Sequence, residues 1–390
     1  MSLSKNVYLD NAATTPMSPS VVDLIADEMR NDFGNASSTH SFGREARRVV
    51  EHARQTIAKA INAKDQEIIF TSGGSESNNT VIFGVAEMRQ KAGKHLITTK
   101  IEHESVLKSM QHLEELGFDV TYLDVDETGH IDLNQLKEAL TPDTILVSVM
   151  AVNNEVGSVN PLKEIGEIVK DSNAYFHVDA VQGLGNIDID VQDMNIDFLS
   201  TSAHKINGPK FLGFLYERDG IRVPNRIYGG DQEMKRRAGT ENVPGIAGFG
   251  KAVEEVQEVA KADLQAKYAG FQKLILDTLD QNGVAYEVNS PLTGLVSHHV
   301  LNLRLNGVST YVLIANLDLA GFSVSGGSAC TAGSLTPSHV LTAMFGAKSP
   351  RVSESIRVSF GRYNTAEEVQ AFADALVEIV EKIKARQAKD

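Results

Sequence analysis

The sequence predicts an α/β fold in which a mostly parallel sheet forms a large domain and a smaller α+β domain accompanies it. Three observations support this prediction. Apolar runs of strand length alternate with amphipathic helical stretches through the first part of the chain. From about Asn242 the alternation gives way to a long helical stretch and then to shorter strands. The 390 residues also exceed what one hydrophobic core usually serves.

The large domain is predicted from its rhythm of strands and helices. Two helical stretches, 104–117 and 162–170, repeat apolar residues at helical spacing and end near Gly or Asn. Strands that alternate with such helices form βαβ units, so we expect a parallel sheet covered on both faces. The expected strands are the apolar runs at 67–72, 95–100, 119–125, 144–152, 175–180 and 196–203.

The smaller domain is predicted from the end of the sequence. A single long helix is expected over residues 252–281, where Asn282 and Gly283 stop it. Shorter strands are expected at 298–305 and 355–360. A final helix should begin after Thr365, which forms a capping-box pair with Glu368 ahead of an apolar stripe.

Charge and composition limit the classes of partner. With 37 basic and 51 acidic residues the net charge is −14, which disfavours broad attraction to nucleic acid or anionic membrane. Residues 235–237 form a local basic cluster, which fits a dimer interface as well as it fits nucleic-acid binding. The first residues lack the features of a secretory signal or a transit peptide, and no apolar run approaches the roughly 20 residues that cross a bilayer. We expect a cytoplasmic protein whose partners are small molecules or proteins.

Metal and disulfide chemistry have little support. Cys330 is the one cysteine, which excludes an intrachain disulfide and a multi-thiolate metal site. It is therefore either a small core residue or a reactive thiol. The adjacent His298 and His299 should point to opposite faces of a strand, and no Cys/His cluster has metal-ligand spacing. We interpret both histidines as structural and expect no metal.

A phosphate site is indicated at 71–79, TSGGSESNN, where two glycines follow a strand and precede a helix. Converging N–H groups at a helix N-terminus bind anions, and Ser75 supplies a hydroxyl and a predicted helix cap. Ordinary N-capping explains most such turns, so the anion interpretation needs support from elsewhere.

That support comes from two later strands. Asp179 ends an apolar strand, where a carboxylate is costly to bury unless a cation such as a protonated pyridine nitrogen pairs with it. Lys205 closes the next apolar strand and offers an amine for a Schiff base, with Ser202 and His204 as phosphate donors beside it. The alternative is a strand-end Asp and a solvated Lys.

Together these segments resemble the class V aminotransferase family, and within it the cysteine desulfurases of the NifS/IscS type, which depend on pyridoxal 5′-phosphate (PLP). The resemblance implies an aspartate-aminotransferase-like large domain at 15–262. A small domain would comprise 1–14 and 263–390 and carry a catalytic cysteine loop at about 323–336. The matching motifs are YLDNAATTP (8–16), GNASSTHSFGR (34–44), SGGSESNN (72–79), EHESV (102–106), NNEVG (153–157), HVDAVQ (177–182), SAHKINGPK (202–210), RRAGTEN (236–242), SGGSACTAGSLTPSHVL (325–341) and IRVSFGRYNT (356–365).

The resemblance also assigns roles around the cofactor. Lys205 would carry PLP as a Schiff base, and Asp179 would pair with the pyridine nitrogen and keep the ring an electron sink. Gln182 would hydrogen-bond the phenolic oxygen, while His103 would stack on the ring and move protons. The remaining cofactor ligands implied are Gly74, Ser75, Asn154, Ser202, His204 and, from the second subunit of a homodimer, Thr240.

The implied reaction is desulfuration of L-cysteine. Arg357, assisted by Asn154, would bind the substrate carboxylate. Cys330 lies in a run of small residues without apolar periodicity and would take the sulfur as a persulfide, leaving L-alanine. Sulfur acceptors in iron–sulfur cluster, thio-cofactor or tRNA biosynthesis are the implied partners. Phe211 departs from the family pattern, since glycine is usual at that position.

Two alternatives stay open at this point. One is a selenocysteine lyase or another β-eliminating enzyme on the same cofactor scaffold. The other is a protein that acts mainly as a sulfur-relay binding platform, although the intact set of cofactor residues weighs against a purely structural role.

Overall fold

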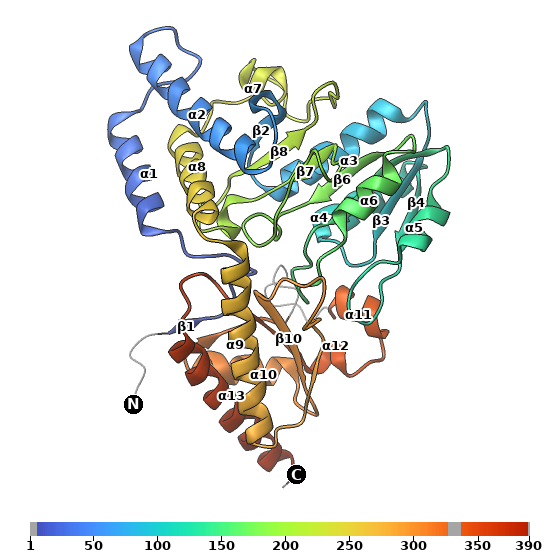
Figure 1. Ribbon diagram of the computed structural model, residues 1–390, viewed down its shortest axis with the longest axis vertical. Coiled ribbons are helices and arrows are strands. Elements are labelled where there is room, and N and C mark those ends of the chain that lie inside the picture. Colours follow the sequence, from blue (N-terminus) through green and yellow to red (C-terminus); the bar gives the residue numbers. More distant parts are fainter. Residues whose placement is uncertain (1–5, 327–336, 389–390) are drawn as a thin grey trace.

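The computed structural model describes residues 6–326 and 337–388. A seven-stranded sheet runs in the order β2-β8-β7-β6-β5-β3-β4 (Figure 1). The pairs from β7 to β4 are all parallel, whereas β8 is antiparallel to both of its neighbours. The predicted α/β class with a mostly parallel sheet is therefore confirmed. The strands are β2 (Ile68–Thr71), β3 (His95–Thr99), β4 (Asp119–Leu123), β5 (Thr144–Met150), β6 (Tyr175–Asp179), β7 (Phe198–Ser200) and β8 (Gly213–Glu217).

Helices cover both faces of this sheet, as expected. Neighbouring strand residues point to opposite faces of the sheet. Leu146 packs on the face covered by α3 and α4, while Val147 packs on the face covered by α2, α6 and α8. The central strand β5 is therefore buried along its whole length, because neither face meets water, whereas the edge strand β4 is partly exposed. The helices of this part are α1 (Pro19–Asn31), α2 (Ser41–Ala60), α3 (Gly74–Arg89), α4 (Glu104–Glu115), α5 (Leu133–Ala139), α6 (Leu162–Val169), the short α7 (Gln232–Lys235) and α8 (Val243–Gln257).

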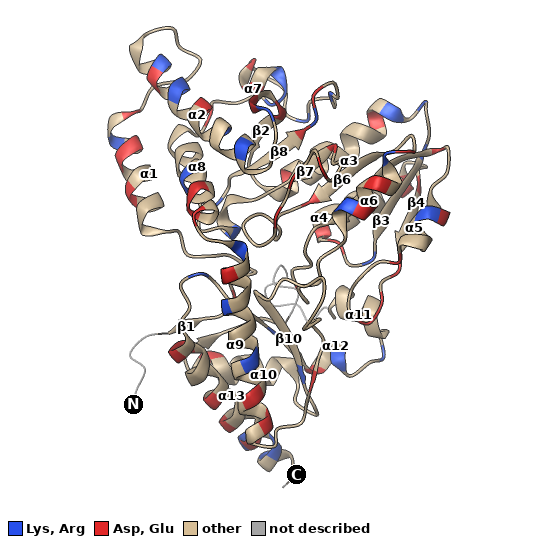
Figure 2. Cartoon of the chain, in the orientation of Figure 1, with Lys and Arg blue, Asp and Glu red and all other residues tan. Residues whose placement is uncertain are grey.

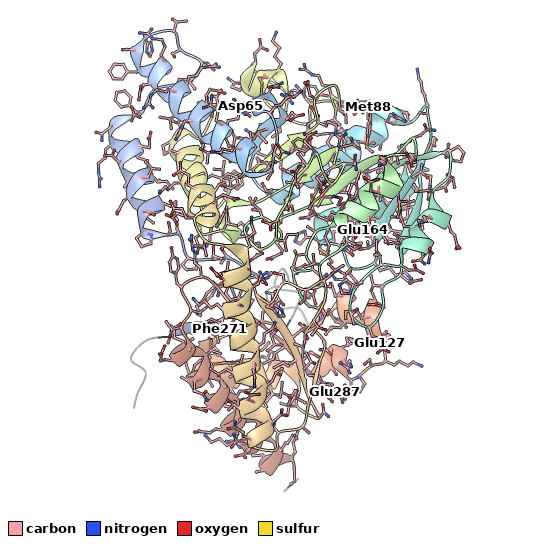
Figure 3. The ribbon with its side chains drawn as sticks, viewed as in Figure 1. Asp65, Met88, Glu127, Glu164, Phe271 and Glu287 are labelled. Atoms are coloured by element: carbon pink, nitrogen blue, oxygen red, sulfur yellow. The ribbon has the colours of Figure 1, made fainter. Side chains whose placement is uncertain are left out.

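A second core lies below the large sheet in Figure 1. It brings Val7 and Leu9 from the start of the chain together with apolar side chains from Tyr268 to Ile383. Figure 3 labels Phe271 on α9, whose ring packs edge-on against Phe360 at 5.4 Å between centroids. The predicted division into a large domain and a small domain stays a prediction. The remaining helices and strands are β1 (Val7–Tyr8), α9 (Lys261–Gln281), β9 (Tyr286–Val288), β10 (Val300–Leu305), α10 (Thr310–Leu319), β11 (Phe322–Ser323), α11 (His339–Phe345), α12 (Arg351–Glu354), β12 (Ser355–Ser359) and α13 (Ala366–Gln387). Of these, α11 packs in a separate small cluster with Ile101, Met150 and Val156.

The prediction of one long helix over 252–281 was wrong. The structure has two helices there, and the chain leaves helical geometry at Ala260, the residue before α9. Side chains of α8 such as Val256 pack in the core of the large sheet, whereas Phe271 and Ile275 of α9 pack in the second core. A single straight helix could not bury its apolar side chains in both cores, so the chain breaks between α8 and α9. The final helix does begin with the predicted capping box between Thr365 and Glu368.

Charged residues of both signs are interspersed along the outer helices (Figure 2). Of the helices in residues 6–326 and 337–388, none is both long and apolar enough to cross a membrane. In the same ranges, no group of three or more His, Cys, Asp or Glu side chains is arranged to hold a metal ion.

Candidate active site

A cavity of about 440 Å³ opens where strands β5 and β6 end and where α3 and α4 begin. The crevice beyond the carboxyl ends of parallel strands is the usual ligand site of such sheets. Ten of the predicted site residues line this one cavity: Gly74, Ser75, His103, Asn154, Asp179, Gln182, Ser202, His204, Lys205 and Arg357.

Lys205 reaches the cavity from a single 3₁₀ turn, Ala203–Lys205, and not from the strand that it was expected to close, because β7 already ends at Ser200. Its Nζ donates hydrogen bonds to the carbonyl oxygens of Ala12 at 2.6 Å and Ala13 at 2.9 Å. The amine is thus anchored by the segment that follows β1, nearly 200 residues away in sequence.

Asp179 is the last residue of β6, and β7 is its parallel neighbour, as the sequence predicted. The carboxylate is buried. Its Oδ1 accepts from the Val181 amide at 3.0 Å and its Oδ2 accepts from the Asn78 side-chain amide at 2.7 Å. Asn78 was not predicted as a site residue, although it lies in the SGGSESNN motif, one turn after Ser75 in the same helix. These two donors fix the carboxylate while it faces the cavity.

The N-terminus of α3 forms one wall of the cavity. Gly73 adopts φ 145°, and a Cβ at Gly74 would lie only 2.5 Å from a methyl group of Val181, so both positions need glycine. The prediction that Ser75 caps this helix was wrong: the helix begins at Gly74 after an N-cap glycine, and Ser75 lies in the first turn. Ser75 therefore keeps its hydroxyl beside helix N–H groups that lack intrahelical acceptors.

Ser202 and His204 also line the cavity, and the Ser202 hydroxyl lies beside Gly73, the N-cap of α3. The His204 Nδ1 lies 3.1 Å from the Thr14 hydroxyl. Burial, with Lys205 and Lys210 nearby, lowers the pKa of His204 to about 4, so the ring is neutral at physiological pH. A neutral ring still offers one N–H donor.

His103 is the N-cap of α4, and its position beside the cavity follows from that geometry. Its Nδ1 accepts from the Ser105 backbone amide at 3.1 Å. A nitrogen that accepts carries no proton, so in the neutral ring the proton is on Nε2.

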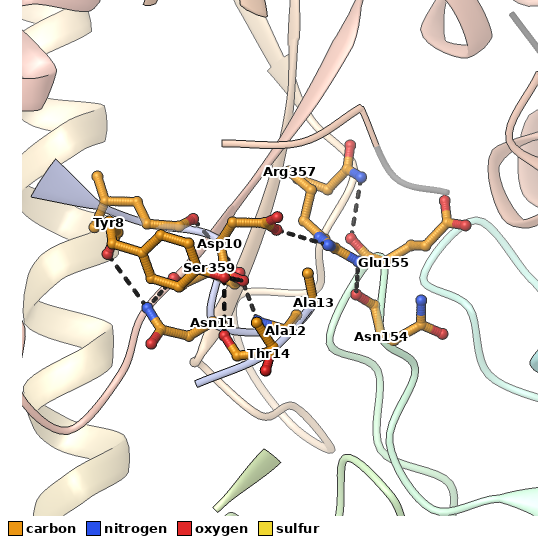
Figure 4. Close-up of polar contacts among 12 residues, drawn as sticks. Tyr8, Asp10, Asn11, Ala12, Ala13, Thr14, Asn154, Glu155, Arg357 and Ser359 are labelled. Carbon is orange, nitrogen blue, oxygen red and sulfur yellow. Dashed lines mark hydrogen bonds and ion pairs between the residues drawn. The ribbon is translucent and has the colours of Figure 1, made fainter. Parts of the chain in front are cut away.

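Arg357 lies on β12 and is 1% exposed. Figure 4 shows its guanidinium between Asp10 and Asn154: Nη2 donates to Asp10 Oδ1 at 2.8 Å and Nη1 donates to the Asn154 carbonyl at 3.0 Å. Asp10 belongs to the YLDNAATTP motif but was not predicted as part of the site. Its carboxylate compensates a cation that would otherwise be costly to bury.

Glu102, next to His103, is a buried carboxyl group that sequence reasoning also missed. Its Oε1 accepts from the Met150 amide at 2.9 Å and the Thr99 hydroxyl at 2.7 Å. Within the described ranges, its Oε2 has no hydrogen-bond partner. Burial raises the pKa of Glu102 to about 8, although the two hydrogen bonds to Oε1 act to lower it.

The two remaining predicted site residues are Cys330 and Thr240. Cys330 lies outside the described residues, although Pro337 and His339, seven and nine positions later, line the cavity. Thr240 is described but exposed, and it does not line the cavity of its own chain.

Comparisons with known proteins place the chain in a family. A sequence model described as aminotransferase class V matches residues 7–372. The chain is 52% identical over 379 residues to the putative cysteine desulfurase IscS 1 of Bacillus subtilis, an alignment that covers 97% of this chain and 100% of the relative. It is 43% identical over 380 residues to the cysteine desulfurase IscS of Clostridium botulinum, covering 97% of this chain and 95% of that one.

Solved structures agree with these relatives. A NifS-like protein superimposes with a TM-score of 0.89 at 36% identity, covering 96% of this chain and 99% of that chain. A structure of SspA in complex with cysteine gives a TM-score of 0.80 at 37% identity, covering 92% and 99%. The full-length matches in both sequence and structure show that this chain belongs to the class V aminotransferase family.

Proposed function

We propose that this chain is a PLP-dependent cysteine desulfurase, which takes sulfur from L-cysteine and leaves L-alanine. The observation that carries the proposal is the convergence of Lys205, Asp179 and Arg357 on one cavity. An amine, a buried carboxylate and a buried guanidinium are the groups that an amino-acid-processing PLP site requires. Relatives named cysteine desulfurase over their full length support this substrate, as does the neighbour solved with cysteine.

The residues present fit the cofactor. The turn at Gly73 and Gly74 leads into the start of α3 at the cavity wall, where helix N–H groups and Ser75 would hold the phosphate. Asp179, fixed by Asn78 and Val181, would face the pyridine nitrogen. When bound, PLP supplies an electron sink for charge that develops on the substrate Cα.

The chain's own groups would then act in sequence. Arg357 binds the substrate carboxylate by a bidentate contact, with Asn154 beside it. The Lys205 amine removes the Cα proton, and His103, protonated at Nε2 when neutral, holds a donor toward the cavity.

Cys330 would receive the sulfur. Its thiolate attacks the substrate sulfur, so an S–S bond forms as the C–S bond breaks, and the electron pair of that bond stays with the substrate carbon. Protonation of that carbon gives alanine, and the enzyme keeps a persulfide. Pro337 and His339 lie on the cavity wall a few residues after Cys330, which supports this assignment.

We also propose a homodimer in which Thr240 completes the phosphate site of the other subunit. Its exposure, away from the cavity of its own chain, supports this arrangement. We place the enzyme in the cytoplasm, where reducing conditions keep a single thiol available. Its sulfur would pass to acceptor proteins of iron–sulfur cluster, thio-cofactor or tRNA biosynthesis.

The decisive experiment records the absorption spectrum of the purified protein with and without L-cysteine, followed by mass spectrometry of the Cys330 peptide. We expect a yellow protein, a cysteine-dependent spectral change and the mass of one added sulfur atom on Cys330. Cys330→Ala should keep the colour and the spectral change but release no sulfide. Full desulfurase turnover by that variant, or a colourless wild-type protein, contradicts the proposal. Parallel trials with selenocysteine test the alternative substrate.

A further inference from the structure

A buried hydrogen-bond chain ends at Gln182, the residue expected to face the phenolic oxygen of PLP. The Gln182 Nε2 lies 2.9 Å from the Ala12 carbonyl oxygen, and the Gln182 Oε1 lies 3.1 Å from the His299 Nε2. The His299 Nδ1 in turn lies 2.7 Å from the Ser297 hydroxyl. Gln182, Ser297 and His299 are all buried, which strengthens these bonds.

The direction of every bond in this chain follows from chemistry. A carbonyl oxygen only accepts, so the amide nitrogen of Gln182 must face Ala12 and the amide oxygen must face His299. That oxygen needs a donor, which places the ring proton of His299 on Nε2. The bare Nδ1 must then accept from the Ser297 hydroxyl. The arrangement thus selects one amide orientation and one histidine tautomer.

We infer that His299 is a positioning residue for the cofactor: its Nε2–H holds the Gln182 carboxamide with its NH₂ group, and not its oxygen, toward the Ala12 side of the cavity. This inference rests on the proposed function, since it assigns Gln182 to the phenolic oxygen of PLP. This role goes beyond the structural one that the sequence predicts for His299.

The surroundings of His299 keep its ring neutral, so that the Nε2–H remains the donor to Gln182. Burial, together with the nearby Arg357 and Lys205 cations, lowers the pKa of His299 to about 3, so the ring stays neutral over the working pH range. The backbone is fixed as well, because the His299 carbonyl accepts from the Phe360 amide at 2.8 Å, three residues after Arg357. The strand pair that presents Arg357 therefore also fixes Gln182.

His298 provides a matched control. It precedes His299 directly, but its Nδ1 lies 2.8 Å from Gln272 Oε1 on α9; like His299, it does not line the active-site cavity. A change at His298 disturbs the same segment without touching Gln182.

The test compares holoenzymes carrying His299→Met, which has similar bulk and no donor, and His299→Gln, which can restore an N–H. A donor to the phenolic oxygen draws electron density from the cofactor and lowers its proton affinity. We expect His299→Met to raise the pH midpoint of the visible cofactor band by about half to one unit. His299→Gln should recover most of the wild-type midpoint, and His298→Met should leave it unchanged. An unchanged midpoint in His299→Met, or equal shifts in His299→Met and His299→Gln, overturns the inference.

A second measurement needs no variant that must load cofactor. In the wild-type protein labelled with ¹⁵N-histidine, the His299 signal, identified by its loss in His299→Gln, should report the Nε2–H tautomer unchanged between about pH 5 and 9. An Nδ1–H tautomer, or titration in that range, overturns the inference. Because apoprotein gives the same readout, this test separates the hydrogen-bond chain from the proposed enzyme activity: a wild-type protein that binds no PLP contradicts the latter alone.

Discussion

At the scale of single residues, burial decides what each charged group in the cavity can do. Arg357 and Asp179 are both almost fully covered, so their charges interact strongly with the few groups that reach them. Asp10 holds Arg357, and Asn78 holds Asp179. Neither Asp10 nor Asn78 was predicted as a site residue. The motifs contained both residues, but a motif does not say which of its members touch.

Replacing Arg357 with Ala should mainly weaken substrate binding, by roughly 2–5 kcal/mol, because a buried bidentate partner of the carboxylate is lost. The KM for L-cysteine should rise far more than kcat falls. Arg357→Lys should recover only part of the loss, since an ammonium group cannot bind in bidentate fashion. The control is Arg304→Lys on β10, a strand arginine paired with Glu287 and Glu354 outside the cavity. An unaltered KM in Arg357→Ala would exclude the assigned role.

Glu102 predicts a pH dependence of stability. Its pKa is about 8 when folded, against an ordinary value of 4.5, so the folded state holds a proton that the unfolded state releases between these values. Wild-type stability should therefore fall as pH rises from about 5 to 8, by at most about 1.4 kcal/mol per unit. Glu102→Gln, which is neutral throughout, should lose this slope in denaturant titrations.

Glu138→Gln, at an exposed position of α5, is the control and should keep the wild-type slope. Parallel curves for Glu102→Gln and wild type would show that Glu102 is ionised in the folded protein.

At the scale of elements, two segments depart from regular geometry for reasons that lie elsewhere in the fold. Phe211 is 81% exposed and adopts φ 57°, a left-handed conformation that favours glycine. The α7 segment has three consecutive left-handed residues, Glu233 to Lys235. It is held by the Glu233 carboxylate, which accepts two bonds from Arg54 and one from the Phe70 amide.

Glu233→Gln should destabilise the protein by about 3–5 kcal/mol, because Arg54 is left as an inadequately compensated buried charge. The free energy of unfolding from urea titration measures this loss. Glu45→Gln serves as the control, since its pair with Arg48 on the same helix α2 is exposed and the unfolding midpoint should not move. Equal midpoints for Glu233→Gln and wild type would contradict the structural role of this ion pair.

At the scale of the whole molecule, the site draws on widely separated parts of the chain. Lys205 contacts the carbonyls of Ala12 and Ala13, while Arg357 contacts Asp10 and Asn154. The start of the chain thus lies between the large sheet and the second core, where it touches the groups of both. In the proposed dimer a further residue, Thr240, comes from the other subunit.

Hybrid dimers test this shared site. One subunit carries Lys205→Ala and the other Thr240→Val, each with its own affinity tag. If Thr240 acts across the interface, the hybrid contains one fully native site and should show about half of the wild-type turnover per dimer. If Thr240 acts within its own chain, the hybrid should show only half the rate of the Thr240→Val homodimer. Wild-type activity in that homodimer would exclude Thr240 from the site altogether.

The sequence by itself determined the alternation of strands and helices, the parallel sheet, the capping box of the last helix and most of the cavity. These features follow from local periodicity and from short motifs at strand ends, which one stretch of chain can encode. The exceptions were contacts at long range. Val256 and Phe271 belong to different cores, which only the packing of α8 and α9 reveals. Likewise Asp10 meets Arg357, and His299 meets Gln182, because segments far apart in the sequence converge. The direction of a hydrogen bond depends on which partner each side chain meets, and the spacing of residues along the sequence does not identify a distant partner. The tertiary structure alone therefore decided how these side chains are held.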